Sequence, residues 1–592
     1  MSTHDTIPEP ERNVNRAKEA TTGLQRDMVE ESHDDGRLSA LRRYAGPLVI
    51  SGSVVVLVSA FLSWSYDSDP LGDVTFYGNP APTQYVAVIL GLLGLAFWFG
   101  GGPLRKVFTW FDTAKALKPL GYGALAFAVL VILSIALESS GLINVEPGGW
   151  LLLLGGALMA LGGRVMPARS HADPLHSTTS SWTEIVTIIV VLAAALFITA
   201  YALDLEGGGE FVTLLAGLGA VGAAAAKGGL FSWLQIASAK HRQVLMLGAV
   251  AVAFLFPFTQ NGSDANMSIA TQVIIFATTA LGLNIVVGLA GLLDLGYIAF
   301  LGAGAYVAAM MSEAATATIN WHPPFIVVAL IGMLVSATLG LIIGSPTLRV
   351  SGDYLAIVTL AFGEIFRISV NNMDGGNGPD LTHGPNGIAG IPELNFFGFN
   401  FGDTHTVAGI PLTRYANYYF LLLLLAALVI TVFVRLNNSR IGRGWVAIRE
   451  DERAAEAMGV NVFGLKLLAF AGGAALAGLA GTIKAHQDLA VSPDQYVFLE
   501  SAFLLAAVVL GGMGTVAGVL VGATLLKLLP EKLRFLSDYR LLMFGVLLVL
   551  MMRFRPEGLL PSTRRQLEFH EDDEALALEA QELHVETEGA KA

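Results

Sequence analysis

The chain contains no cysteine among its 592 residues, and it carries few charged side chains. Without thiols it can form no disulfide framework, no thiolate nucleophile and no cysteine-ligated metal site. Charged residues make up 14% of the sequence and hydrophobic residues 54%, whereas about 25% charged residues is usual for soluble domains. The scarcity of charge therefore excludes an ordinary soluble domain and predicts a membrane protein.

Several motifs are also missing. The chain has no Gly-x-x-x-x-Gly-Lys-Ser/Thr phosphate loop, and it lacks even a Gly-Lys dipeptide. Because that lysine and hydroxyl hold nucleotide phosphates, we expect a non-enzyme that does not itself hydrolyse ATP. No cluster of His, Asp or Glu has metal-ligand spacing within the apolar segments, so we expect neither a metal nor a cofactor in this subunit. The net charge of −13 gives no reason to expect nucleic acid as a partner.

Apolar segments of 15 to 22 residues are abundant, and they predict an all-α, polytopic helical membrane protein with about sixteen spans. Residues 1–40 lack an apolar signal region and are expected to form a disordered cytoplasmic tail. We place an N-terminal extension of about six spans at 41–240, a core of about ten spans at 241–563 and an acidic cytoplasmic tail at 564–592. The predicted spans are 45–64, 85–101, 120–138, 150–166, 183–203, 211–226, 244–258, 269–290, 293–311, 325–344, 354–371, 416–435, 465–485, 498–511, 516–530 and 538–552.

Connections rich in lysine and arginine alternate along the chain with connections that have few of them, and this alternation indicates how the chain crosses the membrane. The segments 436–464 and 553–565 are rich in basic residues, whereas the long connection 372–415 contains only Arg414. The positive-inside rule therefore predicts that both termini and 436–464 face the cytoplasm, while 372–415 faces outward; Lys532 and Arg534 are exceptions. Gly, Pro and Asn predict turns in 372–415, which forms either a landing surface for another protein or an ordered cap.

The connection 436–464 contains a charged segment that is expected to form a short amphipathic helix from Ala447 to Met458, ended by Gly459. Its apolar face consists mainly of small residues, which allow close docking into a groove on another protein. The periodicity alone is equally compatible with a solvated helix lying on the chain's own membrane domain. The residues predicted to share the apolar face are Ala447, Ile448, Ala454, Ala455 and Met458.

Polar residues within the spans are few, and they are candidates for a translocation path. A charge at mid-membrane costs roughly 2.5–3.5 kcal/mol on insertion scales, so each should face protein or water. Glu364 and Arg367 are three residues apart and can pair along one helix face, as path lining or as a structural ion pair. Lys484 closes a span and is expected to snorkel. Glycines between 282 and 304 indicate either tight packing or a broken helix that exposes backbone groups to a solute. The path candidates are Asn284, Asp294, Tyr297, Glu364 and Arg367.

The stretch RAAEAMG, from Arg453 to Gly459, resembles the Glu-Ala-Ala-x-x-x-Gly loop of ABC importer permeases, with Arg453 in place of the Glu and without the downstream Ile-x-Leu-Pro. A wider similarity runs through LGLNIVVGLAGLLDLGYIAFLGAGAYVAA, SPTLRVSGDYLAIVTLAFGEIFR, HGPNGIAGIP, LGGMGTVAGVLVGA and MMRFRPEGLLP. These stretches resemble branched-chain amino acid ABC transporter permeases of the LivM type over about 240–565, which leaves the first 240 residues unaccounted for.

The resemblance implies a permease core whose charged helix couples transport to ATPases, with Ala447, Ile448, Asp451, Ala454, Ala455, Met458 and Gly459 as its coupling residues. It also implies two cytoplasmic ATPase subunits, a second homologous permease and an extracytoplasmic substrate-binding protein. The location would be the inner membrane of a prokaryote, and the cargo leucine, isoleucine, valine or a related small polar solute. A gradient-driven secondary transporter or channel is the alternative that the residues leave open.

Overall fold

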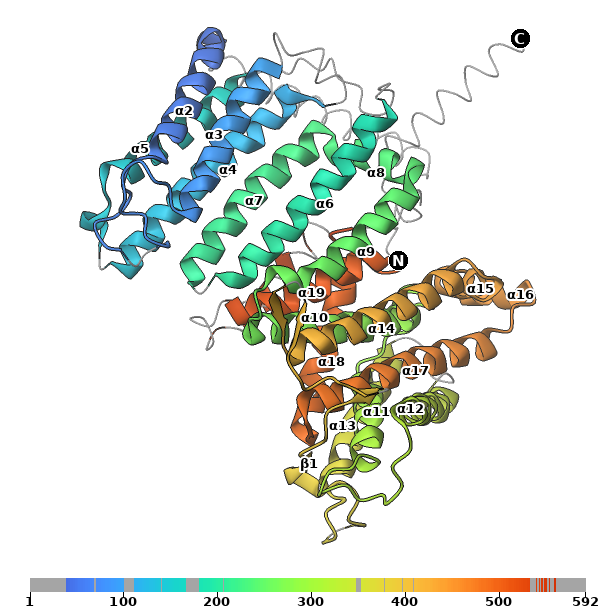
Figure 1. The fold of residues 1–592 in the computed structure, drawn as a ribbon. Helices are drawn as coiled ribbons and strands as arrows, with labels where there is room; N and C mark the ends of the chain where they lie inside the picture. The colour runs from blue at the N-terminus through green and yellow to red at the C-terminus, as the bar shows by residue number, and fades with distance from the viewer. Residues whose placement is uncertain are drawn as a thin grey trace, which may run out of the picture. The chain divides into compact units, whose positions relative to one another are not determined.

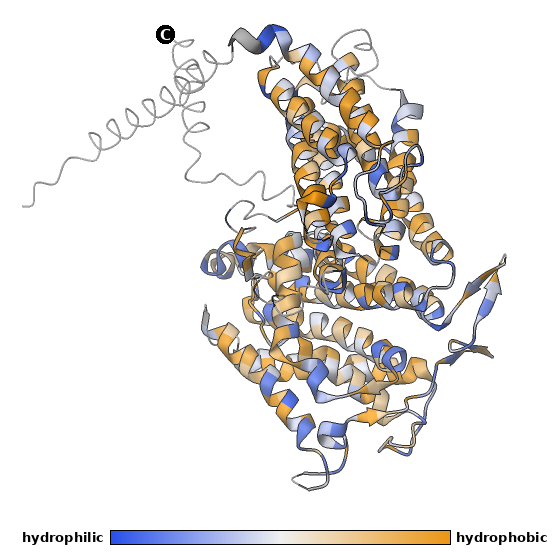
Figure 2. Cartoon of the chain, turned by 90° about the vertical axis from the view of Figure 1, so that its left-hand side faces the viewer, coloured by the Kyte–Doolittle hydropathy of each residue, from blue (hydrophilic) through white to orange (hydrophobic). Residues whose placement is uncertain are grey.

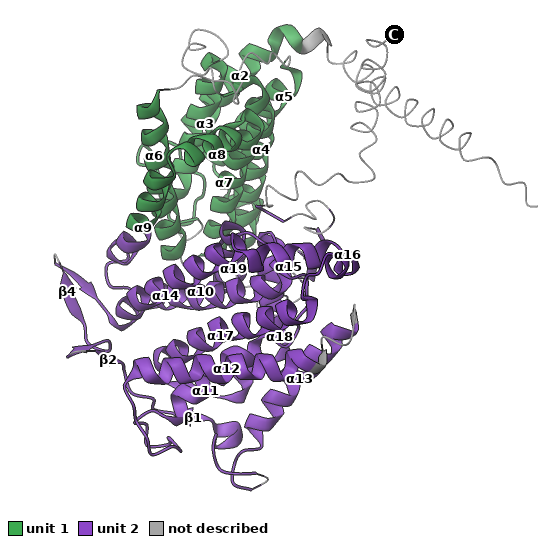
Figure 3. Cartoon of the chain, turned by 90° about the vertical axis from the view of Figure 1, so that its right-hand side faces the viewer, with its two compact units in different colours: residues 1–252 green, residues 253–592 purple. Residues whose placement is uncertain are grey.

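The computed structural model describes residues 39–532 except 69–70, 101–110, 140, 167–179, 206, 348–352, 377, 397 and 408, together with scattered residues between 539 and 560. The expected tails at 1–40 and 564–592 therefore lie almost wholly outside the described residues. The chain divides into two compact units, residues 1–252 and 253–592 (Figure 3). Helices dominate both units, so the predicted all-α class is confirmed.

Unit 1 is built from apolar helices that pack through small residues. Helix α2 (Ala45–Ser59) lies against α5 (Pro147–Val165), where a Cβ added to Gly52 would stand 2.8 Å from the Gly155 carbonyl oxygen. Such close backbone approach is typical of membrane helices. The other elements are the 3₁₀ helices Ser39–Tyr44 and Leu142–Asn144 and the helices α3 (Pro82–Gly100), α4 (Thr113–Glu138), α6 (Ser181–Asp204), α7 (Gly208–Gly228), α8 (Leu230–Lys240) and α9 (Arg242–Thr259), which continues into unit 2.

Unit 2 combines long and short helices with three small antiparallel strand pairs (Figure 1). Strand β1 pairs with β6, β2 with β3 and β4 with β5. The helices are α10 (Asp264–Asn284), the π-helix η3 (Ile285–Leu289), α11 (Ile298–Met310), α12 (Phe325–Thr347), α13 (Asp353–Asn371), α14 (Arg414–Asn437), α15 (Arg440–Glu450), α16 (Glu452–Ala457), α17 (Val462–Asp488), α18 (Phe498–Gly511) and α19 (Val516–Lys532). The strands are β1 (Ile388–Ala389), β2 (Asn395–Phe396), β3 (Phe399–Asn400), β4 (His405–Val407), β5 (Ile410–Leu412) and β6 (Ala490–Val491), with 3₁₀ turns at η4 (Gly384–Asn386) and η5 (Pro493–Tyr496).

Helix α17 is central to unit 2, because it packs against α10, α11 and α12 (Figure 1). Its contact with α11 depends on glycine, since a Cβ added to Gly304 would lie 2.0 Å from the Gly478 carbonyl oxygen. Between α10 and α11 the chain passes through η3 and then turns at Gly291, whose φ of +71° favours glycine. This interruption is one of the short or broken helices that the sequence predicts.

Twelve helices in the described part of the chain are long and apolar enough to cross a membrane, and α11 is a shorter apolar helix. Apolar residues cover most helical surface, and polar residues gather at helix ends and connections (Figure 2). Every predicted span up to residue 530 overlaps a helix. The segment 293–311 is corrected, since its helix begins only at Ile298. The last predicted span, 538–552, lies largely outside the described residues, and the count of sixteen stays a prediction.

Candidate functional site

The α14–α17 connection forms two short helices where the sequence predicted a single helix from Ala447 to Met458, so that prediction is wrong. Helix α15 ends at Glu450, and Asp451 leaves the helical conformation with φ −152° and ψ 108°. The Asp451 carboxylate accepts hydrogen bonds from the backbone N–H groups of Arg453 and Ala454, both at 2.9 Å. Aspartate stabilises a helix start in this way, because its oxygens satisfy N–H groups that have no partner within the helix.

The residues predicted to share one apolar face are consequently divided between α15 and α16. The prediction of a common apolar face is therefore also wrong. Ile448 on α15 and Ala455 on α16 are buried, whereas Ala454 is exposed and Met458 is 84% exposed. Ala447 is exposed on α15 as well. Gly459 ends the second helix with a φ of +83°, as predicted for a helix stop. The exposed small side chains of α16 therefore form a surface distinct from the residues that anchor it.

Three contacts attach this connection to the rest of unit 2. The buried indole of Trp445 donates from Nε1 to the Leu465 carbonyl oxygen at 2.7 Å. Lys466 of α17, whose side chain is only 10% exposed, pairs with Glu452 of α16 at 2.6 Å. Both helices of the connection are thus fastened to the beginning of α17, and α16 is presented on a fixed base.

The third contact leads to the interruption between α10 and α11. Arg449 of α15 donates from Nη1 to the Gly288 carbonyl oxygen in η3 at 2.9 Å. A Cβ added to Gly291 would lie 2.6 Å from Cγ of Arg449, so the glycine turn provides the space that this arginine occupies. This role of Arg449 was not predictable from local sequence, because 161 residues separate the arginine from its acceptor. The cluster of glycines around 282–304 was the only local signal for such a contact.

Asn284, a predicted path residue, joins the end of α10 to the turn between α18 and α19. Its side-chain oxygen accepts from the backbone N–H of Gly514 at 2.8 Å, and its Nδ2 donates to the Thr515 carbonyl oxygen at 3.2 Å. The Asn284 side chain is fully buried. Its hydrogen-bonding groups are therefore engaged in fixing the GGMGT turn, in a position next to the Arg449 contact along the chain.

Tyr297 and Asp294 lie in the segment that enters α11. The Tyr297 hydroxyl donates to the Gly473 carbonyl oxygen of α17 at 2.6 Å, and the ring is fully buried. One Asp294 oxygen accepts from the Gly296 N–H at 2.9 Å, while the other is buried with no hydrogen-bond partner in the described part of the chain. The side chains of Asn284, Asp294 and Tyr297 are thus all buried, and their role along a solute path stays a prediction.

Glu364 and Arg367 lie apart from that segment, on α13. They pair with each other as the spacing of three residues predicts, with Arg367 Nε donating to Glu364 Oε1 at 2.9 Å. Their side chains are 39% and 27% exposed, so neither charge is enclosed. The pairing within one helix agrees with a structural ion pair, and path lining by these residues stays a prediction.

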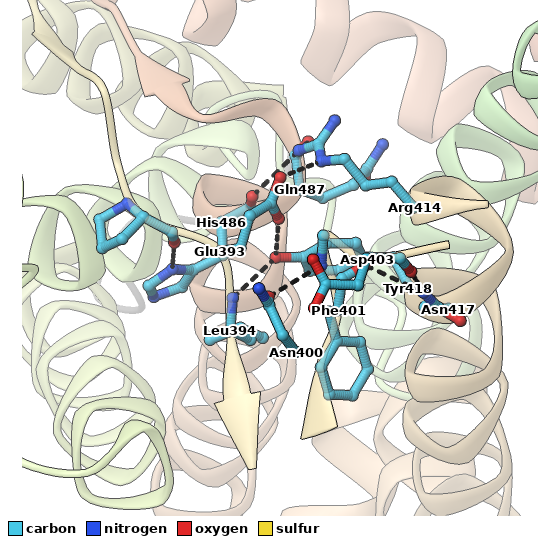
Figure 4. A network of polar contacts seen from close by, with 12 residues as sticks. Glu393, Leu394, Asn400, Phe401, Asp403, Arg414, Asn417, Tyr418, His486 and Gln487 are labelled. Carbon is cyan, nitrogen blue, oxygen red and sulfur yellow. Dashed lines mark hydrogen bonds and ion pairs between the residues drawn. The ribbon is translucent and has the colours of Figure 1, made fainter. Parts of the chain in front are cut away.

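The α13–α14 connection is fixed at its base by a polar network (Figure 4). Glu393 pairs with Arg414 and accepts a hydrogen bond from the Tyr418 hydroxyl at 2.8 Å. Arg414 also donates to the Gln487 carbonyl oxygen, and the His486 ring contacts the Pro392 carbonyl oxygen through Nδ1 at 2.9 Å. Together with the β1–β6 pair, these contacts tie the connection to the end of α17. The predicted turns are present as two hairpins, β2–β3 and β4–β5.

An assembly of apolar helices with an interrupted helix at its centre and a charged, anchored connection defines a multi-pass membrane permease. The sequence profile for the branched-chain amino acid transport system permease component matches residues 266–552. The chain belongs to this family, as its similarity to individual members also shows. It is 41% identical over 342 residues to the high-affinity branched-chain amino acid transport system permease protein LivM of Salmonella typhimurium, covering 56% of this chain and 77% of that protein.

Two further relatives extend the comparison. A probable branched-chain amino acid transport permease protein LivM of Methanocaldococcus jannaschii is 26% identical over 256 residues, covering 40% of this chain and 68% of that protein. The permease protein LivH of Escherichia coli, from a high-affinity branched-chain amino acid transport system, is 30% identical over 184 residues, covering 30% of this chain and 58% of that protein. No solved structure matches the chain. The profile match begins in unit 2, so unit 1 lies outside it.

Proposed function

We propose that this chain is the membrane-spanning subunit of an ATP-driven ABC importer that carries branched-chain amino acids, or a related small polar solute, into the cytoplasm. The family membership and the names of the relatives support the class of cargo. The distribution of basic residues supports an inner-membrane topology with both termini and the α14–α17 connection on the cytoplasmic side. ATP hydrolysis then belongs to partner subunits, since this sequence contains no phosphate loop.

The observation that carries the proposal is the path of contacts from α16 to the α10–α11 interruption. Helix α16 presents exposed small side chains, including Ala454, to a cytoplasmic ATPase, while Asp451 and Gly459 define its two ends. Glu452 and Trp445 attach α16 and α15 to α17, so that a displacement of the docked surface moves these helices together. Arg449 passes that displacement to Gly288 and the π-helix. The π-helix can move in response to this displacement, because an irregular helical turn can change its hydrogen bonding locally.

The assembly that this function requires contains two ATPase subunits, a second permease and an external substrate-binding protein. Similarity to both LivM and LivH proteins supports a pairing of homologous permeases. The α13–α14 connection is suited to receive the binding protein, because its base is held by Glu393 and Arg414 while residues of the β4–β5 hairpin are exposed. Docking of the binding protein there would open the solute path on the outer side. At the same time, ATP binding would act on the inner side through the α14–α17 connection.

Purification from native membranes followed by reconstitution tests the proposal. We expect phosphate-loop ATPases and a second permease to co-purify in near-equal amounts with the chain. The reconstituted complex should accumulate labelled leucine only with ATP and the binding protein present. A chain that is isolated alone even after crosslinking, and that takes up solute in response to an ion gradient without ATP, would instead establish a secondary transporter.

A further inference from the structure

Unit 2 contains a cavity of about 260 Å³ whose lining combines an apolar wall with a set of charged side chains. Helices α10, α11 and α18 supply the apolar wall, which includes Ile275, Phe276 and Leu504. The cavity is slightly smaller than the roughly 300–1,000 Å³ typical of pockets for drug-sized ligands, so its occupant must be small. The charged and polar lining residues come from α10, α17, η5, α18 and α19, and they are Gln272, Thr279, Lys484, Asp488, Gln495, Glu500 and Lys527.

The charged residues form two ion pairs that differ in how firmly they are held. Lys484 pairs with Asp488 one turn away on α17 and also donates to the Gln495 side-chain oxygen at 3.3 Å. Lys527 of α19 pairs with Glu500 of α18 at 3.0 Å, so this second pair bridges two helices. Asp488 is the last residue of α17, and the snorkelling expected for Lys484 stays a prediction. Charged side chains that share a cavity with an apolar wall lose part of their hydration, and in membrane proteins such charges commonly mark a substrate path.

The Glu500–Lys527 pair offers one negative and one positive group, which are the partners that the ammonium and the carboxylate of a zwitterion need. Both side chains remain partly exposed, at 32% and 28%, and both line the cavity. The Lys527 ammonium also lies 4.7 Å from the centroid of the Phe276 ring, so charge and apolar wall meet at one point. A free α-amino acid presents an ammonium, a carboxylate and a side chain from one carbon. These three groups match a carboxylate, an ammonium and an apolar surface that lie within contact of one another.

We infer that this cavity binds a free α-amino acid with a small aliphatic side chain during translocation. The zwitterion separates the interhelical pair: Glu500 receives the ammonium, Lys527 receives the carboxylate, and Phe276 with Leu504 contacts the side chain. The inference rests on the proposed function and narrows its cargo, since urea and neutral amides lack the two charges that would replace the Glu500–Lys527 bond. Helices α18 and α19 meet at the turn held by Asn284, so the two charges are carried on elements connected to α10.

Removing both charges of the Glu500–Lys527 pair distinguishes a role in solute binding from a role in stabilising the fold. An ion pair that is largely removed from water, as this one is, can often be replaced by apolar residues of similar size without loss of stability, whereas removing one partner leaves an uncompensated charge. We therefore compare Glu500→Leu, Lys527→Met and the double variant in the reconstituted complex, with assembly and ATPase activity as measures of folding. Hydrogen bonds to charged groups are strong enough that losing both should reduce leucine uptake by about 100-fold or more. The double variant should assemble normally and still lack uptake.

A control ion pair lies in unit 1, where Lys240 and Glu184 are joined at 2.8 Å and Glu184 also contacts His241 at 2.8 Å. Glu184→Leu with Lys240→Met should leave uptake within about twofold of the wild type, because neither residue lines the charged cavity. Uptake restored in the Glu500→Leu/Lys527→Met variant relative to its single variants would overturn the inference, because it would assign the pair a purely structural role. If the wild-type complex showed no uptake, the proposed function itself would be overturned. Failure of the inference and failure of the proposed function are therefore distinguishable.

A binding measurement on the wild-type complex in detergent, without the binding protein, covers the case in which the variants do not assemble. Labelled leucine is displaced with unlabelled leucine, with 4-methylpentanoic acid, which lacks the ammonium, and with isopentylamine, which lacks the carboxylate. Leucine should compete at least about 10-fold better than either analogue, since each lacks one charge-assisted contact. Equal competition by the three compounds, or no leucine binding, would overturn the inference.

Discussion

Ala454→Arg should abolish amino acid uptake while leaving the permease folded. Ala454 is exposed on α16, and its backbone N–H is already bonded to the Asp451 carboxylate. An arginine at this position extends into solvent in the isolated subunit, so the helix and its attachment to Lys466 remain intact. Against a docked ATPase the same side chain introduces bulk and an unpaired charge where small residues allow close approach. The loss at a central interface residue is about 2–4 kcal/mol, equivalent to a roughly 30- to 1,000-fold weaker association.

Ala455→Arg and Arg443→Ala are matched controls for this prediction. Ala455 is the neighbouring residue but is buried, so arginine there should lower the thermal stability of the subunit itself. Arg443 is exposed on α15, and its side chain donates to the Asn438 carbonyl oxygen at 3.3 Å. Its replacement by alanine should change uptake by less than about twofold. The measurement combines ATPase co-purification, thermal unfolding and uptake. Normal uptake by Ala454→Arg would exclude α16 as the coupling surface.

The contrast between these two alanines shows where sequence patterns stop being informative. Apolar length predicted the helices of unit 2 well, because a membrane span needs about twenty apolar residues whatever its neighbours are. The segment from Ala447 to Met458 offered no such constraint. Its sequence is compatible with one helix, and only the capping bonds of Asp451 divide it into α15 and α16. With the division, the orientation of every residue after Asp451 changes, which is why Met458 is exposed although helical periodicity placed it beside Ile448.

The candidate site was also predictable only in part because its contacts join residues that are far apart in the sequence. Asn284, Asp294 and Tyr297 were found from their polarity within apolar segments, and all three are buried. What they contact was not predictable, since Asn284 bonds to Gly514, 230 residues away, and Tyr297 to Gly473, 176 residues away. The pairing of Glu500 with Lys527 was missed in the same way, because the two charges lie on different helices. Local spacing identifies pairs within one helix, such as Glu364 and Arg367, and gives no information on pairs between helices.

Arg449→Leu should uncouple ATP hydrolysis from transport. The variant loses the hydrogen bond to the Gly288 carbonyl oxygen, which joins α15 to the π-helix, together with the ion pair to the exposed Glu450. Trp445 and the Lys466–Glu452 pair still hold α15 and α16 on α17, so the ATPase should dock and hydrolyse ATP at a near-normal rate. Uptake per ATP should fall by about 10- to 100-fold, the equivalent of one hydrogen bond to a charged group. Simultaneous measurement of uptake and phosphate release in proteoliposomes checks this ratio.

Gly291→Ala approaches the same contact from the opposite side. Its φ of +71° is strained for alanine, and the added Cβ would lie 2.6 Å from Cγ of Arg449, so the turn and the arginine must separate. If Arg449 transmits displacement, both variants should lower uptake per ATP, while Arg440→Ala at the exposed start of α15 should not. A parallel fall of ATPase activity and uptake in Arg449→Leu would instead make this arginine part of the docking surface. The ratio of the two rates thus distinguishes a residue that binds the ATPase from one that conveys its movement to α10, the helix that lines the charged cavity.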